Sequence, residues 1–173
     1  FYTNTLDVER QGIDLVLSSF WNWSSDASTD FTFAYNYNQI QVTGQRQVNG
    51  VNPVNDALVE DIENNYPKNR FVATANTQFA SDWSLMLRAN WWGKHYDERG
   101  RINGEPGNVS KEIEPVLYID VELAWQVTSN FQAVLGGSNV FDEYPDEMPN
   151  DGYFANRVSV GLPYPRRTVT NYE

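Results

Sequence analysis

The stretch RFVATANTQFASDWSLMLRANWWGKHY, residues 70–96, contains two segments in which apolar and polar side chains alternate. A period of two is typical of β-strands that have one apolar and one polar face. Only Ser81 and Asp82 separate the segments, which predicts an antiparallel hairpin of strands 70–80 and 83–96. The expected apolar face carries Phe71, Ala73, Ala75, Phe79, Trp83, Leu85, Leu87, Ala89 and Trp91.

The same alternation recurs on both sides of this hairpin. It predicts strands at 8–23, 30–43, 115–127 and 130–141. The connections alternate in length, with short turns at 24–29, 81–82 and 128–130 and long polar loops at 45–69, 98–114 and 142–156. The first long loop is expected to hold a helix over 55–63, capped by Asn55 or Asp56. The fold class is therefore all-β: an antiparallel sheet of about six strands whose two ends differ.

The composition favours a sheet in a membrane over a soluble core. The chain has 173 residues with 6 Trp, 10 Tyr and 9 Phe, yet its mean hydropathy is negative. Rings on one face of every strand, with polar residues between them, account for both facts. The sequence has no run of ~18 to 20 apolar residues for a transmembrane helix, and a closed barrel is the other structure that spans lipid.

The two faces receive different expected roles. Rings near the ends of the apolar faces are expected to form membrane girdles, and charged residues on the polar faces are expected to line the lumen, where Asp120 and Glu122 meet Arg10, Arg88 or Lys94. The girdle residues are Trp21, Trp23, Phe71, Phe79, Trp83, Trp91 and Trp125, and the lumen residues are Arg10, Asp14, Arg88, Asp120 and Glu122.

Several function classes are disfavoured. The chain has no Cys and one His, His95, which leaves little for a thiolate or histidine metal centre, although a haem-binding role for His95 stays open. A formal net charge of −11 argues against nucleic acid as a partner. A pair of carboxylates such as Asp120 and Glu122 serves catalysis only with a further group across a cleft. We expect neither an enzyme nor a cofactor.

Two candidate sites lie toward the long-loop end. Trp92, Tyr96 and Tyr118 have polar-face parity, and their rings are candidates for stacking on a ligand or for packing against loops. Acidic residues follow the sixth strand, and Asp142, Asp146 and Asp151 are candidate Ca²⁺ ligands. A solvated acidic loop is the alternative reading of that cluster, which also contains Glu143 and Glu147.

Residues 130–145, NFQAVLGGSNVFDEYP, resemble the stretch near the C-terminus of TonB-dependent outer-membrane receptors, where an Asn-Leu-Phe-Asp motif precedes Tyr-Pro. Val140 stands in place of the Leu. The segments 118–128, 8–15 and 66–71 are similar to other recurring strands of that family. The resemblance implies part of a plugged barrel of about 22 strands in the bacterial outer membrane. It also implies active uptake of an iron chelate such as a siderophore, of cobalamin or of a carbohydrate.

The resemblance implies as partners TonB, acting through a plug domain that this chain lacks, together with lipid or lipopolysaccharide and a small ligand. Residues 164–173 resemble the loop that precedes the family's final strand, so that strand is expected to be missing and the chain to be a fragment. Three alternatives share part of the pattern: a passive porin, a soluble β-sandwich binding module and a carbohydrate-active enzyme. A sandwich would pack Leu85, Leu117, Ile119 and Leu123 against a second sheet.

Overall fold

The computed structural model describes residues 5–52, 54–98, 105 and 110–146. Eight strands and one helix are defined in these residues. In chain order they are β1 Leu6–Ser24, β2 Ala27–Gln45, α1 Asp56–Asn64, β3 Asn69–Phe79, β4 Trp83–Trp92, β5 His95–Asp97, β6 Lys111–Ile113, β7 Val116–Thr128 and β8 Phe131–Gly137.

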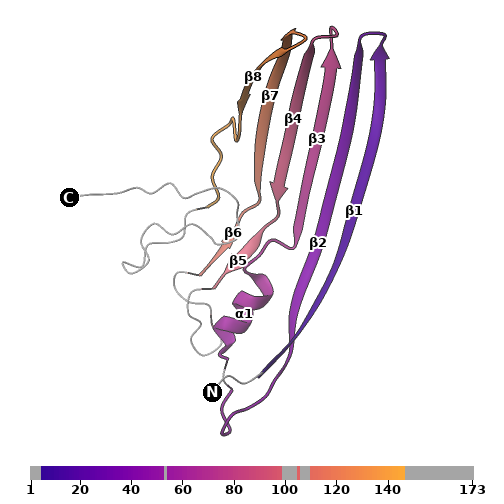
Figure 1. Cartoon of the computed structure of the whole chain (residues 1–173). Helices are drawn as coiled ribbons and strands as arrows, with labels where there is room; N and C mark the ends of the chain where they lie inside the picture. The colour runs from indigo at the N-terminus through magenta and orange to yellow at the C-terminus, as the bar shows by residue number, and fades with distance from the viewer. Residues whose placement is uncertain (1–4, 53, 99–104, 106–109, 147–173) are drawn as a thin grey trace, which may run out of the picture.

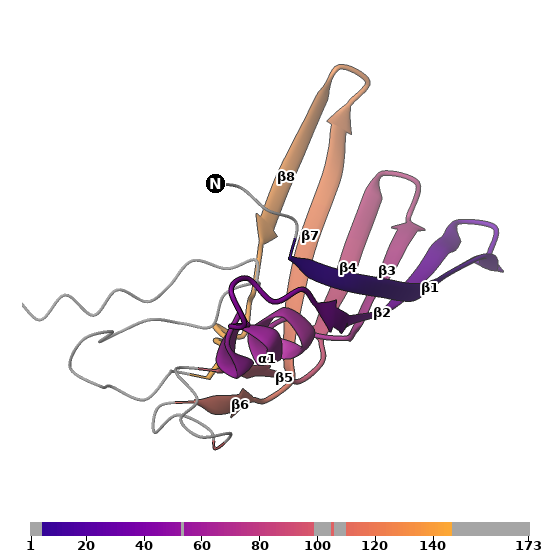
Figure 2. The same cartoon turned by 90° about the horizontal axis from the view of Figure 1, so that it is seen from below.

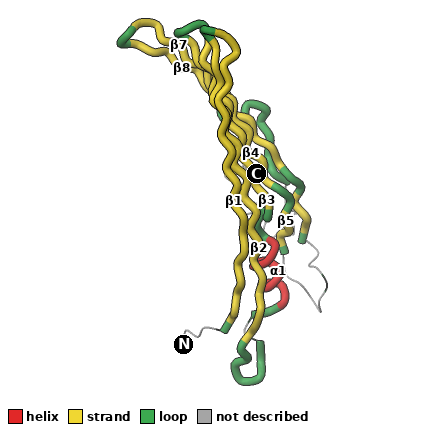
Figure 3. The backbone as a smooth tube through the Cα atoms, turned by 90° about the vertical axis from the view of Figure 1, so that its right-hand side faces the viewer, coloured by secondary structure: helices red, strands yellow, loops and turns green. Residues whose placement is uncertain are grey.

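Six of the strands form one antiparallel sheet in the order β1-β2-β3-β4-β7-β8. Each strand therefore pairs with the next long strand of the chain, and the β5–β6 hairpin is inserted between β4 and β7 (Figure 1). Figure 3 shows the sheet as a single layer. The antiparallel all-β prediction is confirmed. The described strands do not close into a barrel, because β1 and β8 remain as the two edges.

The two ends of the sheet differ as the connection lengths predict. The hairpin turns β1–β2, β3–β4 and β7–β8 lie together at one end (Figure 1). At the β3–β4 turn, Ala80 and Ser81 adopt positive φ values of 49° and 60°, which suit a tight reversal. The other end carries α1 and the β5–β6 hairpin, as the view from below also shows (Figure 2).

Two predicted strands are shorter than the alternation suggested. The strand predicted over 83–96 ends at Trp92, and the chain becomes extended again at His95 as β5, which pairs with β6 and not with β3. The strand predicted over 130–141 ends at Gly137, because Asn139 takes a left-handed φ of 48°. A β-ladder requires extended backbone, so β8 does not continue past Asn139.

The predicted helix is present with the predicted cap. Asn55 is the N-cap of α1, and its side-chain oxygen accepts the N–H of Leu58 over 2.9 Å. The helix lies beside β2, where Glu63 accepts the N–H of Val42 over 2.7 Å. This bond satisfies a backbone donor on the part of β2 that runs past the end of β3. None of the described helical segments is long and apolar enough to cross a membrane.

The strand register brings the alternate side chains of all six strands into common rows. One row of the apolar face runs Leu15, Tyr35, Phe71, Trp91, Leu117, and the adjacent row of the polar face runs Asp14, Asn36, Arg70, Trp92, Val116. The face predicted for each strand is therefore the same physical face of the sheet.

Burial along β7 is the reverse of what a soluble sheet shows. The residues of polar-face parity Val116, Tyr118, Asp120 and Ala124 are buried, whereas Leu117 and Trp125 of the apolar face are exposed. Apolar side chains of a soluble sheet face its core. Among the described residues, the buried ones instead gather at the long-loop end and on the polar face, with Ile113, His95, Asp97 and Glu98.

Candidate functional site

The exposed apolar face carries two bands of contacting rings. Near the short-turn end, Phe79, Trp83 and Trp125 stack in sequence across β3, β4 and β7, with ring centroids 6.5 and 5.3 Å apart. Near the long-loop end, Phe71 lies 5.7 Å from Phe33 of β2 in a tilted arrangement and 5.2 Å from Trp91 of β4 in a stacked one. Trp21 and Trp23 extend the first band to β1, with centroids 5.7 Å apart. All seven predicted girdle residues therefore lie in one of two bands on a single face.

The spacing between the bands fits an outer-membrane barrel. Trp83 and Trp91 are eight residues apart on β4, which corresponds to about 26 Å along a strand. A strand tilt of about 40° reduces this to about 20 Å across the membrane, close to the apolar height of ~25 Å in such barrels. The side chains between the bands are aliphatic or small: Ala73, Ala75, Leu85, Leu87, Ala89, Ile119, Val121 and Leu123.

Two of the indoles on this face are bonded within the protein. The indole N–H of Trp23 donates to Thr29 Oγ1 over 2.9 Å, and the Thr29 hydroxyl contacts that of Thr77 over 2.9 Å. The Trp21 N–H donates to Ser19 Oγ over 2.6 Å. Hydrocarbon offers no hydrogen-bond partner, so internal pairing is what a lipid-facing surface requires.

The opposite face carries the predicted lumen residues. The Arg10 guanidinium donates to Asn38 Oδ1 over 2.7 Å, and Asp14 accepts from Asn36 over 2.7 Å. Arg88 lies directly opposite Asp120 in the β4–β7 register. Glu122 is on the same face and exposed. Lys94 lies apart from these residues and forms an ion pair of 3.0 Å with Glu112.

The three candidate ligand-stacking residues do not form one open surface. Tyr118 on β7 has no exposed area, as a packing role requires. The Tyr96 hydroxyl on β5 donates to Glu98 Oε2 over 3.1 Å. Trp92 on β4 is covered on one ring face by the Arg70 guanidinium, 4.0 Å from the ring centroid. A stacking role for Trp92, Tyr96 or Tyr118 stays a prediction.

The long-loop end holds a buried polar cluster that the sequence did not predict. It comprises His95, Asp97 and Glu98, which are 6%, 2% and 3% exposed. Glu98 accepts from Ser110 Oγ over 2.6 Å, and its N–H donates to Asp61 of α1 over 3.0 Å. The cluster thus links α1 to β5. The available signal was Gly93, where the alternation breaks, and the shared parity of His95 and Asp97 beyond it.

Burial lowers the pKa of His95 below its ordinary value of 6.5, while the charge of Asp97 and a backbone hydrogen bond at Gly93 act in the opposite direction. The folded protein therefore resists protonation of His95. As the pH falls below about 6.5, the unfolded state binds a proton that the folded state rejects, and the β5 region loses stability.

We expect amide exchange of residues 95–97 and 111–113, corrected for intrinsic rates, to be faster at about pH 5.5 than at about pH 7.5. The variant His95→Gln removes the titrating group, so the difference between the two pH values should shrink. An unchanged difference in that variant would contradict the prediction.

Asp120 connects β7 to the turn that ends β8. Its Oδ1 accepts the backbone N–H of Asn139 over 2.9 Å, and its Oδ2 accepts from Asn90 over 3.2 Å. The Asn139 side chain then bonds both backbone groups of Glu143, donating to its carbonyl over 2.8 Å and accepting its N–H over 3.1 Å. The Asn-Val-Phe-Asp segment is therefore a closed turn held on the polar face.

The acidic candidates for Ca²⁺ are partly engaged by other groups. Asp142 accepts from the Tyr144 hydroxyl over 2.8 Å, and Asp146 pairs with Lys111 over 3.1 Å. Glu147 and Asp151 lie outside the described residues. Within the residues that are described, no group of three or more carboxylate or imidazole side chains is arranged to hold a metal ion.

Comparisons of the chain with protein-family models, with curated proteins and with solved structures gave no match.

Proposed function

We propose that this chain is part of the wall of a bacterial outer-membrane β-barrel that takes up a scarce ligand by TonB-dependent transport. The observation that carries the proposal is the apolar face of the sheet: in the described residues no second sheet covers it, and it bears two aromatic bands at a membrane-like spacing. In the proposed function the chain makes and breaks no covalent bond.

Lipid is the environment that stabilises such a face. Exposed apolar patches on soluble monomers rarely exceed a few hundred Å², and here the face extends over β1, β2, β3, β4, β7 and β8. Leu85, Leu117, Ile119 and Leu123 pack against no second sheet in the described residues, in contrast to what a β-sandwich requires. The internally bonded indoles of Trp21 and Trp23 support the same assignment.

The two open edges support a larger barrel. β1 is 19 residues long and β8 has 7 residues, and an unpaired edge in hydrocarbon leaves backbone groups without partners. Further strands of the intact protein are therefore expected to pair with β1 and β8. A barrel of about 22 strands, as in the family that the sequence resembles, encloses a lumen wide enough for a plug.

The resemblance of residues 130–145 to the family's motif is what favours a TonB-dependent transporter over a passive porin. The residues of the family-like motif are the ones that close the turn at Asn139: Asn139 bonds Glu143, and Tyr144 bonds Asp142. The motif thus has a physical role at the end of a wall strand next to the long loops, where a ligand enters the family's barrels.

The membrane assignment is tested by single spin labels in the intact protein reconstituted in lipid. The chain contains no native cysteine. A spin label attached to a single introduced cysteine therefore reports the environment of that position alone. Labels at Leu85 and Leu87 are expected to collide several-fold more often with oxygen than with a water-soluble nickel complex, because oxygen concentrates in lipid. Labels at Ser84 and Arg88 should show the reverse preference. Equal water access on both faces would contradict the proposal.

Transport is tested in cells by uptake of ferric chelates, cobalamin and oligosaccharides. Uptake of one of these classes is expected to be lost when either this protein or TonB is removed. Uptake that continues without TonB and rises linearly with ligand concentration would instead identify a passive channel.

A further inference from the structure

We propose that residues 139–146 act as a strap that holds the β5–β6 hairpin in place, with Asp146 as its releasable end. The strap leaves β8 at Asn139 and reaches the end of β6. Its two ends are bonded to different elements, so the position of the hairpin depends on the position of β7 and β8.

The first end of the strap is firmly held. Asn139 donates its N–H to Asp120, which is only 8% exposed, and Val140 donates its N–H to the Ile119 carbonyl over 2.8 Å. Two bonds to successive residues of β7, one of them to a buried carboxylate, resist solvent competition. The Asn139–Glu143 bonds then fix the course of the chain beyond β7.

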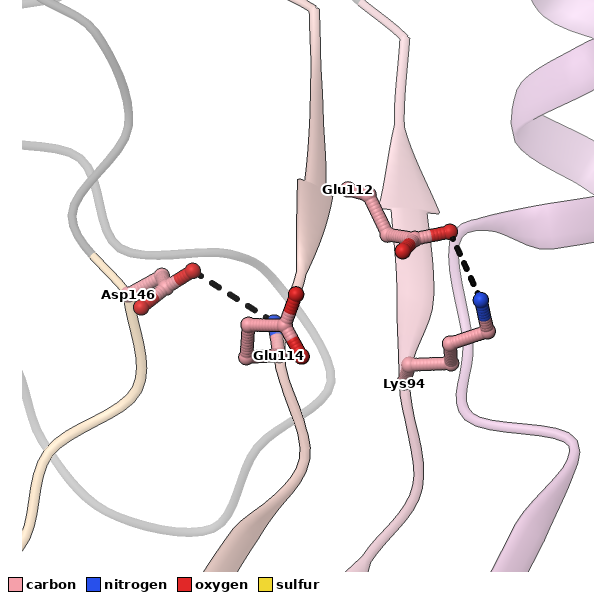
Figure 4. A network of polar contacts seen from close by, with 4 residues as sticks. All are labelled: Lys94, Glu112, Glu114 and Asp146. Atoms are coloured by element: carbon pink, nitrogen blue, oxygen red, sulfur yellow. Dashed lines mark hydrogen bonds and ion pairs between the residues drawn. The ribbon is translucent and has the colours of Figure 1, made fainter.

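The second end of the strap is held through one carboxylate oxygen, Oδ2 of Asp146. Asp146 Oδ2 lies 3.1 Å from Lys111 Nζ and 3.4 Å from the Glu114 N–H (Figure 4 draws the second contact). Lys111 belongs to β6, and Glu114 follows that strand directly. The Lys111 and Asp146 side chains are 36% and 33% exposed, so salt reaches this end but not the Asp120 end.

The β5–β6 hairpin is short, so its stability depends on contacts with neighbouring segments such as the strap. β5 and β6 pair over only three residues each and lie outside the six-stranded sheet. A two-stranded hairpin by itself is marginally stable. β5 has a further tether to α1 through Glu98 and Asp61, whereas the strap acts on β6.

A matched control lies within the same hairpin. Lys94 and Glu112 form an ion pair of 3.0 Å with side chains 64% and 53% exposed (Figure 4). Glu112→Gln removes one negative charge from β6 itself, as Asp146→Asn removes one from the strap. A difference between the two variants therefore reports the tether and not the net charge.

The experiment is amide exchange of the intact protein in lipid. In Asp146→Ala, exchange of residues 111–113 is expected to rise several-fold, with unchanged rates in β8 and in 119–121. Asp146→Asn keeps an acceptor oxygen and should show a smaller rise. About 1 M salt should raise the wild-type rate through the same contact, and Glu112→Gln, which breaks a more exposed ion pair, should show a smaller rise than Asp146→Ala.

Unchanged exchange of the hairpin in Asp146→Ala would overturn the inference. So would a rise shared equally by β7 and β8, since that result marks a general loss of stability. The importance of the strap for ligand capture rests on the proposed function, but the exchange rates do not: a protein that fails every uptake test still reports whether Asp146 holds β6.

Discussion

Replacing Leu87 with lysine is expected to destabilise the protein in lipid by about 2–4 kcal/mol, the cost of a cation at the midplane of a barrel wall. Leu87 lies midway between Trp83 and Trp91 on β4, on the face that carries both aromatic bands. Its side chain is 45% exposed. In water the same change would lie within about 0.5 kcal/mol of neutral, because an exposed lysine remains hydrated.

The measurement is urea unfolding of the intact protein in lipid vesicles, compared with that of Asn76→Lys. Asn76 lies on the polar face, directly opposite Asp30 in the β2–β3 register, so a lysine there finds water and an opposite charge. A large loss in Leu87→Lys with little change in Asn76→Lys is the expected pair of results. Equal, small effects of both substitutions would remove the physical basis of the membrane assignment.

Asp120→Ala is expected to show the second large effect, a loss of about 3 kcal/mol in the stability of the β7–β8 region. A hydrogen bond to a charged group contributes about 1.5–3 kcal/mol, and its removal leaves a half-buried donor without its acceptor. Here the Asn139 N–H and the Asn90 amide both lose their acceptor. Asn139 then loses the hydrogen bond of its N–H to Asp120, which stabilises its left-handed backbone conformation.

This effect is measured by amide exchange of β8 and of residues 139–143 in lipid. Asp120→Asn retains one acceptor oxygen and should lose about half as much stability. Glu122→Ala is the matched control, since Glu122 lies two residues away on the same face and is exposed. If Glu122→Ala were as damaging as Asp120→Ala, general charge balance on the polar face, and not the Asn139 turn, would explain the loss.

The strand pattern was predictable because it is local. Ile13, Leu15 and Leu17 on β1 and Leu117, Ile119 and Val121 on β7 recur with a period of two, which places them on one face whatever lies beside the strand. The cap of α1 at Asn55 and the difference between the two ends of the sheet were predictable for the same reason. Both follow from side chains close together in the sequence.

The ends of β4 and β8 were not predictable from periodicity. The alternation predicted strands that run to 96 and to 141, but β4 ends at Trp92 and β8 at Gly137. The chain nevertheless departs from the sheet because of partners that lie far away in sequence: residues 95–97 pair with 111–113, and Asn139 donates its N–H to Asp120. A local pattern carries no information about such partners.

The sequence by itself determined that six strands alternate, which residues share a face, and that short turns and long loops fall at opposite ends. Tertiary structure alone decided that the rings stack into two bands, that His95, Asp97 and Glu98 are buried together with α1, and that residues 139–146 return to β6. The division has one physical cause. Alternation is a property of neighbouring residues along one extended strand, whereas stacking, burial and ion pairing depend on the register between strands that are distant in the chain.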